Sequence, residues 1–142
     1  MDETFIRKMR EFNRFYTDFL GSLNNRVLNS RYSPAAARIL FEISSIPDCT
    51  AGAIVSMLNI DKSYLSRILK SMEKDKLIRK QRSAVDARSF YLLLTDKGKS
   101  ELRMLEEEVK SRLSVLEDSL TPEQRAVLGK NMDEIKNILY GK

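Results

Sequence analysis

Apolar residues at both ends of the chain recur every three or four positions, which predicts long amphipathic helices. Near the N-terminus this pattern predicts a helix over 4–28, followed by a break at 30–32. Towards the C-terminus, Thr95 starts a second long helix, and Thr121 starts a third with Gln124 placed to complete a capping box. The apolar positions behind these predictions are Phe5, Met9, Phe12, Phe15 or Tyr16, Phe19, Leu23 and Val27; Leu102, Leu105, Val109, Leu113 and Leu116; and Val127 or Leu128, Met132, Ile135 and Leu139.

The middle of the chain predicts three shorter helices. Ser33 and Pro34 are typical of a helix start, with the serine as the cap and the proline in the first turn. Thr50 caps a short helix, AGAIVSML, and Asp61 caps the next one, KSYLSRILKSMEKDK. Only about three residues separate these two helices, and a pair so closely joined is typical of a helix-turn-helix.

Residues 77–82 and 89–94 favour two short strands joined by a turn. A hairpin that directly follows a helix-turn-helix is a wing. The expected fold class is therefore mainly α with a small β-hairpin wing, a winged helix-turn-helix core flanked by long N- and C-terminal helices.

The chemistry of the chain is narrowed by what its sequence lacks. It has no histidine and one cysteine, so a zinc site has almost no ligands to draw on, and a Ser-His-Asp or Cys-His arrangement is impossible. We expect neither an enzyme nor a metal or other cofactor. No apolar run is long enough for a membrane span, the N-terminus is too charged for a signal peptide, and a single cysteine suits a reducing cytoplasm.

Basic residues are concentrated in the middle third of the chain. Residues 61–99 contain eleven Lys or Arg and five Asp or Glu, whereas residues 100–142 contain seven and nine. A localised basic excess indicates a polyanionic partner, double-stranded DNA first. The alternatives are a solvated basic face without a partner, or a winged module that binds another protein and reads no DNA.

The helix over 62–74 divides its residues between two faces. Leu65, Ile68, Leu69 and Met72 fall on one face, as core packing requires. On the other, Arg67 can give two hydrogen bonds to a guanine, and Lys70 suits a phosphate. The DNA-binding candidates on this helix are Lys62, Ser63, Tyr64, Ser66, Arg67, Lys70 and Lys74. A generic solvated face is the alternative.

The turn of the hairpin carries Asp86 and Arg88. The arginine can enter a narrow minor groove of DNA beside the helix over 62–74. The carboxylate can fix the tip by accepting hydrogen bonds from loop amides or from an arginine. Arg82 and Ser83 are placed for phosphates. The alternative is an ordinary polar turn with an exposed ion pair.

Two stretches, LNIDKSYLSRILKSMEKDKLIRKQ and SAVDARSFYLLLTDKG, resemble the MarR family of bacterial transcription regulators. The second contains Asp-x-Arg, a strand and Leu-Thr-x-x-Gly in the order typical of that family. The segments FNRFYTDFL and SYLSRIL also resemble the regulator domain fused to N-acetyltransferases in some proteins. Family members often have Gly where Lys76 stands, and Gly favours the left-handed cap. A lysine in that conformation would carry strain of about 1 kcal/mol, so this departure leaves the cap geometry open but not the fold.

The resemblance covers essentially the whole chain and implies one domain over 1–142. Its DNA-binding lobe is expected at 33–99 and its dimerisation helices at 1–32 and 100–142. It implies a homodimer on an imperfect palindrome with half-sites about 10 bp apart, and a ligand-responsive repressor. The dimer candidates are Phe5, Phe12, Phe19, Leu128, Ile135 and Leu139, for which an intramolecular core role is the alternative.

The resemblance also implies a pocket for a small aromatic effector between the dimer helices and the DNA-binding lobe. The lining candidates are Phe12, Arg14, Phe15, Tyr16 and Phe41, although a core role is favoured for them. Some family members sense oxidants with a cysteine in the first helix, where this chain has none. Cys49 lies beside another predicted helix start, where a thiolate can be stabilised, and its default role is that of a structural thiol.

Overall fold

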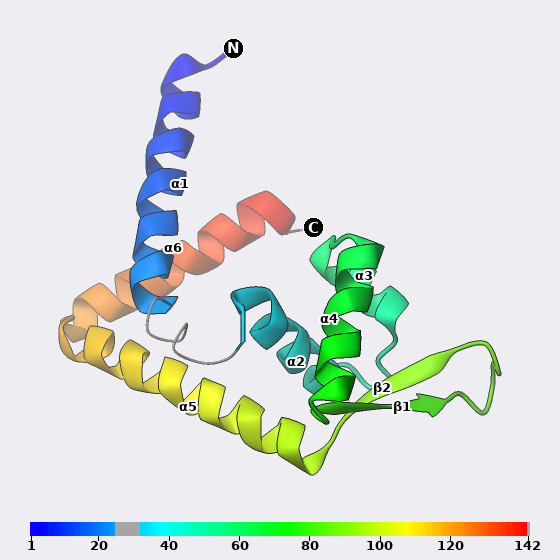
Figure 1. Cartoon of the computed structure of the whole chain (residues 1–142). Coiled ribbons are helices and arrows are strands. Elements are labelled where there is room, and N and C mark those ends of the chain that lie inside the picture. Colours follow the sequence, from blue (N-terminus) through cyan, green and yellow to red (C-terminus); the bar gives the residue numbers. More distant parts are fainter. Residues whose placement is uncertain (25–31, 142) are drawn as a thin grey trace. The chain divides into compact units, whose positions relative to one another are not determined.

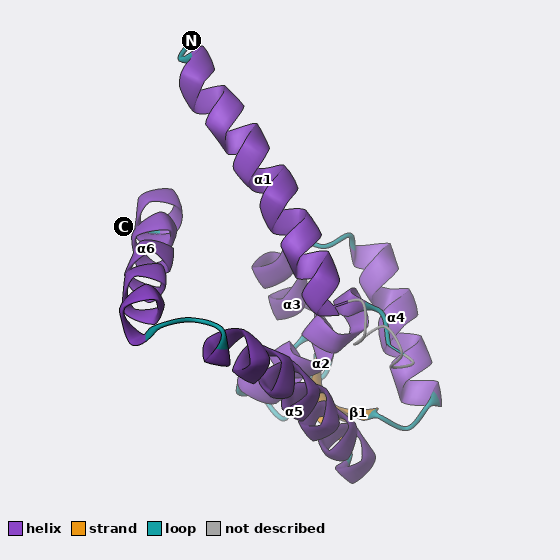
Figure 2. Cartoon of the chain, turned by 90° about the vertical axis from the view of Figure 1, so that its left-hand side faces the viewer, coloured by secondary structure: helices purple, strands orange, loops and turns teal. Residues whose placement is uncertain are grey.

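The computed structural model describes residues 1–24 and 32–141 and consists of helices and one hairpin (Figures 1 and 2). Its elements are α1 (Glu3–Asn24), α2 (Pro34–Ser45), α3 (Ala51–Leu58), α4 (Lys62–Lys74), β1 (Ile78–Arg82), β2 (Phe90–Leu94), α5 (Asp96–Asp118) and α6 (Pro122–Tyr140). The predicted fold class is confirmed. The chain divides into two compact units, Met1–Glu107 and Glu108–Lys142. None of the helices in the described ranges is long and apolar enough to cross a membrane.

Five predicted helix caps are present. The side-chain oxygens of Ser33, Thr50, Asp61, Thr95 and Thr121 each accept a backbone N–H from the first turn of their helix at 2.8–3.1 Å. Gln124 returns a bond, since its Oε1 accepts the N–H of Thr121 at 2.9 Å and completes the capping box. These bonds satisfy N–H groups that have no partner inside the helix, so local sequence sets where these helices start.

The ends of several elements differ from the prediction by one or two residues. The strands begin at Ile78 and Phe90, one residue later than expected, and pair antiparallel from Ile78 with Leu94 to Arg82 with Phe90. The predicted continuation of the first helix to residue 28, with Val27, lies outside the described residues.

The helix α4 ends at Lys74, two residues before the predicted end, because Lys76 adopts the left-handed region with φ of 60°. The N–H of Lys76 donates to the carbonyl of Glu73 at 3.0 Å, and that of Leu77 donates to Met72 at 2.9 Å. This bonding pattern is a Schellman motif, in which glycine is the usual left-handed residue. Lys76 therefore takes the left-handed conformation that a glycine has at this position in such a motif.

The hydrophobic core lies between α2, α3, α4, the hairpin and the first turns of α5. As predicted, α4 turns Leu65, Leu69 and Met72 inward, while Ile68 is half-buried. Burial of such side chains is the main force holding the lobe together. The buried apolar residues are Ile39, Leu40, Ile43, Cys49, Ile54, Leu65, Leu69, Met72, Leu77, Ile78, Leu92, Leu102 and Leu105.

The single cysteine is part of this core. Cys49 is 1% exposed, and its carbonyl accepts the N–H of Leu92 at 2.7 Å, which fixes the segment before α3 against β2. Burial raises the pKa of the Cys49 thiol, and the negative charge of Glu42 adds to that rise. The proposed stabilised thiolate is therefore wrong, since the environment favours the neutral, structural thiol.

The root of the hairpin joins the end of α4 to the start of α5. The hydroxyl of Thr95 contacts the carbonyls of Lys76 and Leu77 at 2.6 and 3.1 Å, and it accepts the N–H of Gly98 at 3.0 Å. The N–H of Thr95 also donates to Leu77 at 3.0 Å. A Cβ on Gly98 would overlap the Leu77 carbonyl oxygen. The Leu-Thr-x-x-Gly motif thus builds a junction that only glycine fits.

The apolar faces of the terminal helices remain exposed in the single chain. In α1, Phe5, Phe12 and Tyr16 are 58%, 45% and 40% exposed, while Phe19 is half-buried. In α6 no residue is buried. None of these side chains belongs to the hydrophobic core formed by the described residues, so their roles as dimer contacts or as core within the chain stay predictions.

Candidate nucleic-acid interface

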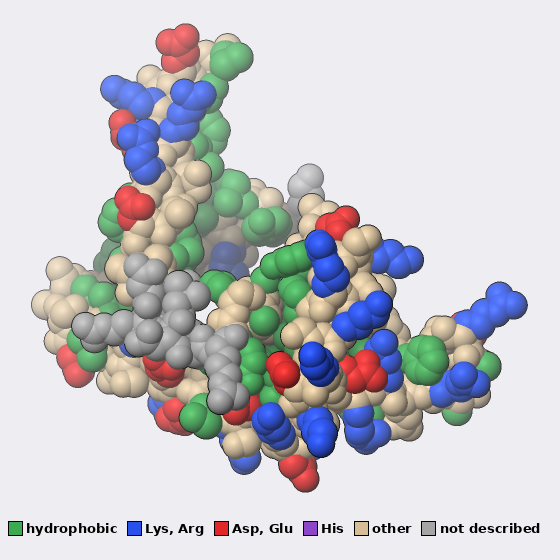
Figure 3. Space-filling model, viewed as in Figure 1, with side chains coloured by type: hydrophobic (Ala, Val, Ile, Leu, Met, Phe, Trp, Pro, Cys, Tyr) green, Lys and Arg blue, Asp and Glu red, His purple; other side chains and the backbone are tan. Residues whose placement is uncertain are grey.

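The outer face of α4 is a continuous exposed surface. Every candidate on it is exposed: Lys62, Ser63, Tyr64, Ser66, Arg67, Lys70 and Lys74. The face arises because α4 packs its apolar positions on the core and leaves its polar positions to solvent. Figure 3 shows Lys and Arg side chains gathered over α4 and the hairpin. Such a face fits the major groove of a duplex, which admits one helix.

Arg67 is held by a ring rather than by a carboxylate. Its Cζ lies 5.9 Å from the ring centroid of Tyr64, one turn earlier on α4. Within residues 1–24 and 32–141, no ion pair engages Arg67. The acidic neighbour on α4, Glu73, is instead 3.7 Å from Lys80 on β1. The guanidinium is thus free to bind a guanine or a phosphate.

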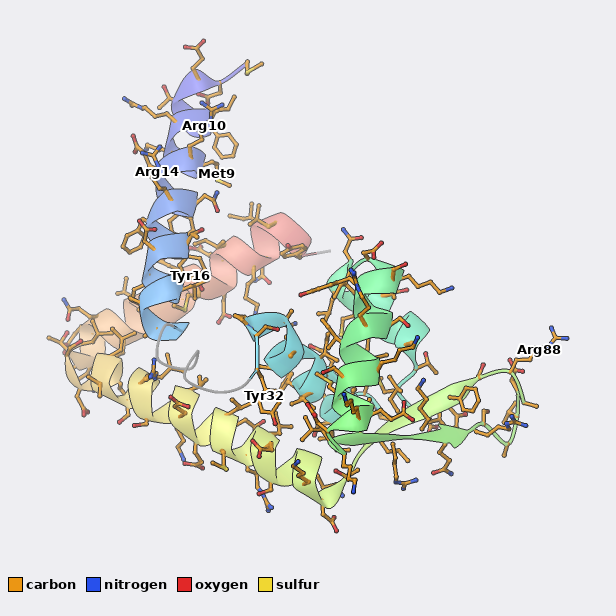
Figure 4. All side chains as sticks on the ribbon, in the orientation of Figure 1. Met9, Arg10, Arg14, Tyr16, Tyr32 and Arg88 are labelled. Atoms are coloured by element: carbon orange, nitrogen blue, oxygen red, sulfur yellow. The ribbon has the colours of Figure 1, made fainter. Side chains whose placement is uncertain are left out.

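The turn of the hairpin is organised by Asp86. Its Oδ1 accepts the N–H of Arg88 at 3.0 Å, and its Oδ2 accepts the hydroxyl of Ser89 at 3.2 Å. The carbonyl of Asp86 also accepts the N–H of Ser89 at 3.0 Å. The predicted partners of the carboxylate were loop amides or an arginine side chain. In the structure, a loop amide and a loop hydroxyl donate to it. The side chain of Arg88 points away from the hairpin at its tip (Figure 4).

Ser83 corrects one predicted role. The residue is 6% exposed, and its hydroxyl donates to the Tyr91 hydroxyl at 3.1 Å or accepts from it. The same oxygen accepts the N–H groups of Val85 and Asp86, both at 3.2 Å. A side chain used in this way inside the loop is not placed for a phosphate. Its role is to hold the turn in shape.

Arg82, the other phosphate candidate, is exposed at the end of β1. Its Cζ lies 5.6 Å from the ring centroid of Phe90, its partner in the strand register. The ring orients the guanidinium without removing its charge. Arg82 therefore stays a candidate for a phosphate contact.

Three features of this region were not found from the sequence. Lys80 neutralises Glu73 from a neighbouring element, Tyr91 meets Ser83 across the hairpin, and Val85 is 95% exposed at the turn. The first two depend on strand register, which period-two alternation signals only weakly.

A groove of about 370 Å³ also lies between α3, α4 and the hairpin, with Lys62 and Lys80 among its lining residues.

The predicted effector residues are only partly brought together. The rings of Phe12 and Tyr16 stack with centroids 5.7 Å apart, and Phe12 and Phe15 lie 6.4 Å apart. Arg14 leaves α1 on a different side from Tyr16 (Figure 4), as two residues of a helix are about 200° apart. Phe41 is 45% exposed on α2. The pocket itself stays a prediction.

Together, the helix pair, the exposed basic face of α4 and the hairpin define a winged helix-turn-helix protein. Residues 32–89 match the sequence model of the MarR family. This segment of the chain is a MarR-family domain.

Known proteins resemble the chain in sequence and in fold. The transcriptional regulator MgrA of Staphylococcus aureus is 36% identical over 80 residues, 54% of each protein, so the chain spans about half the length of this curated relative. A MarR family protein from Bacillus stearothermophilus has a TM-score of 0.84 over 98% of both chains at 17% identity. The repressor CouR, solved on a 23-mer DNA duplex, has a TM-score of 0.74 at 25% identity, covering 88% of this chain and 89% of CouR.

Proposed function

We propose that the chain is a sequence-specific double-stranded DNA-binding transcription regulator that represses its targets as a homodimer on a palindromic operator. The observation that carries the proposal is the exposed face of α4, with Arg67 unpaired in the described chain, beside a wing whose turn is fixed and whose Arg88 points outward. MgrA and CouR, a transcriptional regulator and a repressor bound to DNA, support it. Such a regulator acts in the cytoplasm, where bacterial DNA lies.

The exposed apolar faces of α1 and α6 support the homodimer. Leu128, Ile135 and Leu139 are 40%, 42% and 58% exposed on a single helix, and contiguous exposed apolar surface is typical of an interface. A two-fold dimer presents two copies of α4, which matches an operator with two half-sites. Sedimentation of the pure chain should therefore report twice the monomer mass.

An aromatic effector is the proposed regulator of DNA binding. The stacked rings of α1 offer surfaces for an aromatic ligand, and Phe12 and Tyr16 are both partly exposed. A ligand lowers DNA affinity only if it binds more tightly to a state in which the two lobes misfit the operator. Titration of the protein–DNA complex with small phenolic compounds tests this part of the proposal.

The proposal as a whole is tested by the salt dependence of binding to duplex DNA. Several phosphate contacts make the affinity fall steeply between about 50 and 200 mM salt, because binding releases condensed counterions. A steep fall, together with tighter binding to a palindrome than to random duplex, is the expected result. Affinity that does not change over this range would favour a winged module that binds another protein.

Lys70→Ala is expected to weaken binding to all duplexes by a similar factor. The ammonium of Lys70 is exposed on α4 and makes no ion pair within the described ranges, so it is placed for a phosphate, which carries no sequence information. The slope of log affinity against log salt should fall by about one per subunit. Lys136→Ala, on α6, is the matched control. A change of base preference in Lys70→Ala would contradict the phosphate role.

Asp86→Ala is expected to weaken DNA binding by about tenfold per wing, because Arg88 and its loop must then be ordered on binding. Loss of a negative charge near DNA would alone have the opposite effect, so the sign of the change is informative. Asp86→Asn keeps an oxygen that accepts the N–H of Arg88 and is expected to retain affinity. Tighter binding by Asp86→Ala, measured by fluorescence anisotropy, would show that the carboxylate does not organise the wing.

A further inference from the structure

Val85 is the most exposed large apolar side chain in the described chain apart from the terminal methionine, with 95% of its surface open to solvent. It lies in the turn between Arg82 and Arg88, the two arginines at the end of the hairpin. Its own N–H is held by Ser83 Oγ at 3.2 Å, and the next residue, Asp86, is held in the same way. The backbone at Val85 is therefore fixed while its side chain projects outward.

The turn itself does not require a valine at this position. β-Branched apolar residues are uncommon in turns, where Gly, Asn, Asp and Ser prevail for conformational reasons. The hydrogen bonds that shape this turn come from Ser83 and Asp86, and none of them uses the Val85 side chain. An apolar side chain on a fixed, solvent-exposed backbone between two arginines indicates a surface that is anionic at its edges and apolar within.

The minor groove of DNA is such a surface. Its rims are phosphates, and its walls are the carbon-bound hydrogens of the deoxyriboses. Resting on the function proposed above, we propose that Val85 is a specificity-determining residue that packs in the minor groove beside Arg88 and selects A·T over G·C pairs at the step it covers.

The selection follows from the chemistry of the groove floor. A·T pairs present only acceptors there, whereas guanine adds its 2-amino group, a donor. Methyl groups laid over that amino group exclude water and offer no acceptor, so the donor is left without a partner. Arg88 favours the same steps, since a narrow A·T minor groove concentrates negative potential. The two side chains therefore prefer the same DNA for different reasons.

The experiment uses the full chain and a duplex enriched from a random-sequence library on the wild type. At each flanking step, A·T, G·C and inosine·C pairs are compared, because inosine lacks the 2-amino group but keeps the major-groove face of guanine. At the base step that Val85 covers, the wild type should bind a duplex with G·C about tenfold more weakly than one with inosine·C. This factor corresponds to the free-energy cost of leaving one buried donor without a hydrogen bond. Val85→Ser, whose hydroxyl accepts a hydrogen bond, should reduce that ratio to about twofold.

Two matched variants complete the test. Val85→Ile keeps an apolar β-branched side chain and should keep the discrimination, and Ala84→Ser changes the polarity of the neighbouring loop residue and should keep it too. A wild-type ratio in Val85→Ser, or an equal loss in Ala84→Ser, would overturn the inference while leaving DNA binding intact. If the wild type enriches no duplex, the proposed function falls as well.

Discussion

Gly98→Ala is expected to lower the free energy of unfolding by about 3 kcal/mol, because the new methyl group overlaps backbone that cannot move aside. The overlapping group is the carbonyl of Leu77, which also accepts the N–H of Thr95 at 3.0 Å. Relief requires the first turn of α5 to separate from the hairpin root, which breaks this bond and those of the Thr95 hydroxyl. Urea denaturation followed by circular dichroism measures the loss.

Gly52→Ala is the matched control in the same lobe. A Cβ there has one neighbour, the Thr50 hydroxyl oxygen at 3.9 Å, which is ordinary contact. Because alanine favours helix over glycine by up to about 1 kcal/mol, this variant should be as stable as the wild type or more so. Equal stability of both variants would show that the hairpin root tolerates a side chain and that the junction is not close-packed.

Arg67→Ala is expected to weaken binding to the preferred operator by about 1–3 kcal/mol per half-site and to relax specificity at one base pair. Two hydrogen bonds from a guanidinium to guanine O6 and N7 are the commonest specific contact in the major groove. Tyr64 holds the guanidinium on the exposed face without an ion pair, so little has to be rearranged before it binds. Anisotropy titrations on the operator and its single-base variants measure both effects.

The charge of Arg67 has to be separated from its geometry. Arg103→Ala removes an exposed arginine from α5 and is expected to change affinity slightly and base preference not at all. Arg67→Lys keeps the charge but loses the two-pronged geometry, and it should relax specificity nearly as much as alanine. Unchanged base preference in both Arg67 variants would show that α4 is not the recognition helix.

Features that depend on neighbours along the chain were predictable from the sequence. Caps such as Thr50 and Asp61 accept N–H groups only three residues further along the chain, so the local sequence alone indicates them. The inward face of α4 followed from helical spacing, because Leu65, Leu69 and Met72 can meet the core only together. The left-handed Lys76 lies just past α4, where the family resemblance implies a glycine.

Features that depend on partners far along the chain were not predictable. The role of Ser83 is decided by Tyr91 on the opposite strand, and the state of Cys49 by the core that closes over it. The aromatic residues of α1 show the same limit, since spacing indicates that one face is apolar but not what covers it. Phe12 and Tyr16 are 45% and 40% exposed, and the spacing of α1 does not say which element packs against them.

Enrichment of duplexes from a random-sequence library, followed by hydroxyl-radical footprinting, tests the central claim most directly. If α4 and the wing of each subunit form one DNA interface, the chain should enrich an imperfect palindrome. The footprint should show two protected half-sites about 10 bp apart, with minor-groove protection outside each that is lost in Arg88→Ala. Enrichment of no sequence, or a footprint unchanged by both Arg67→Ala and Arg88→Ala, would contradict the account.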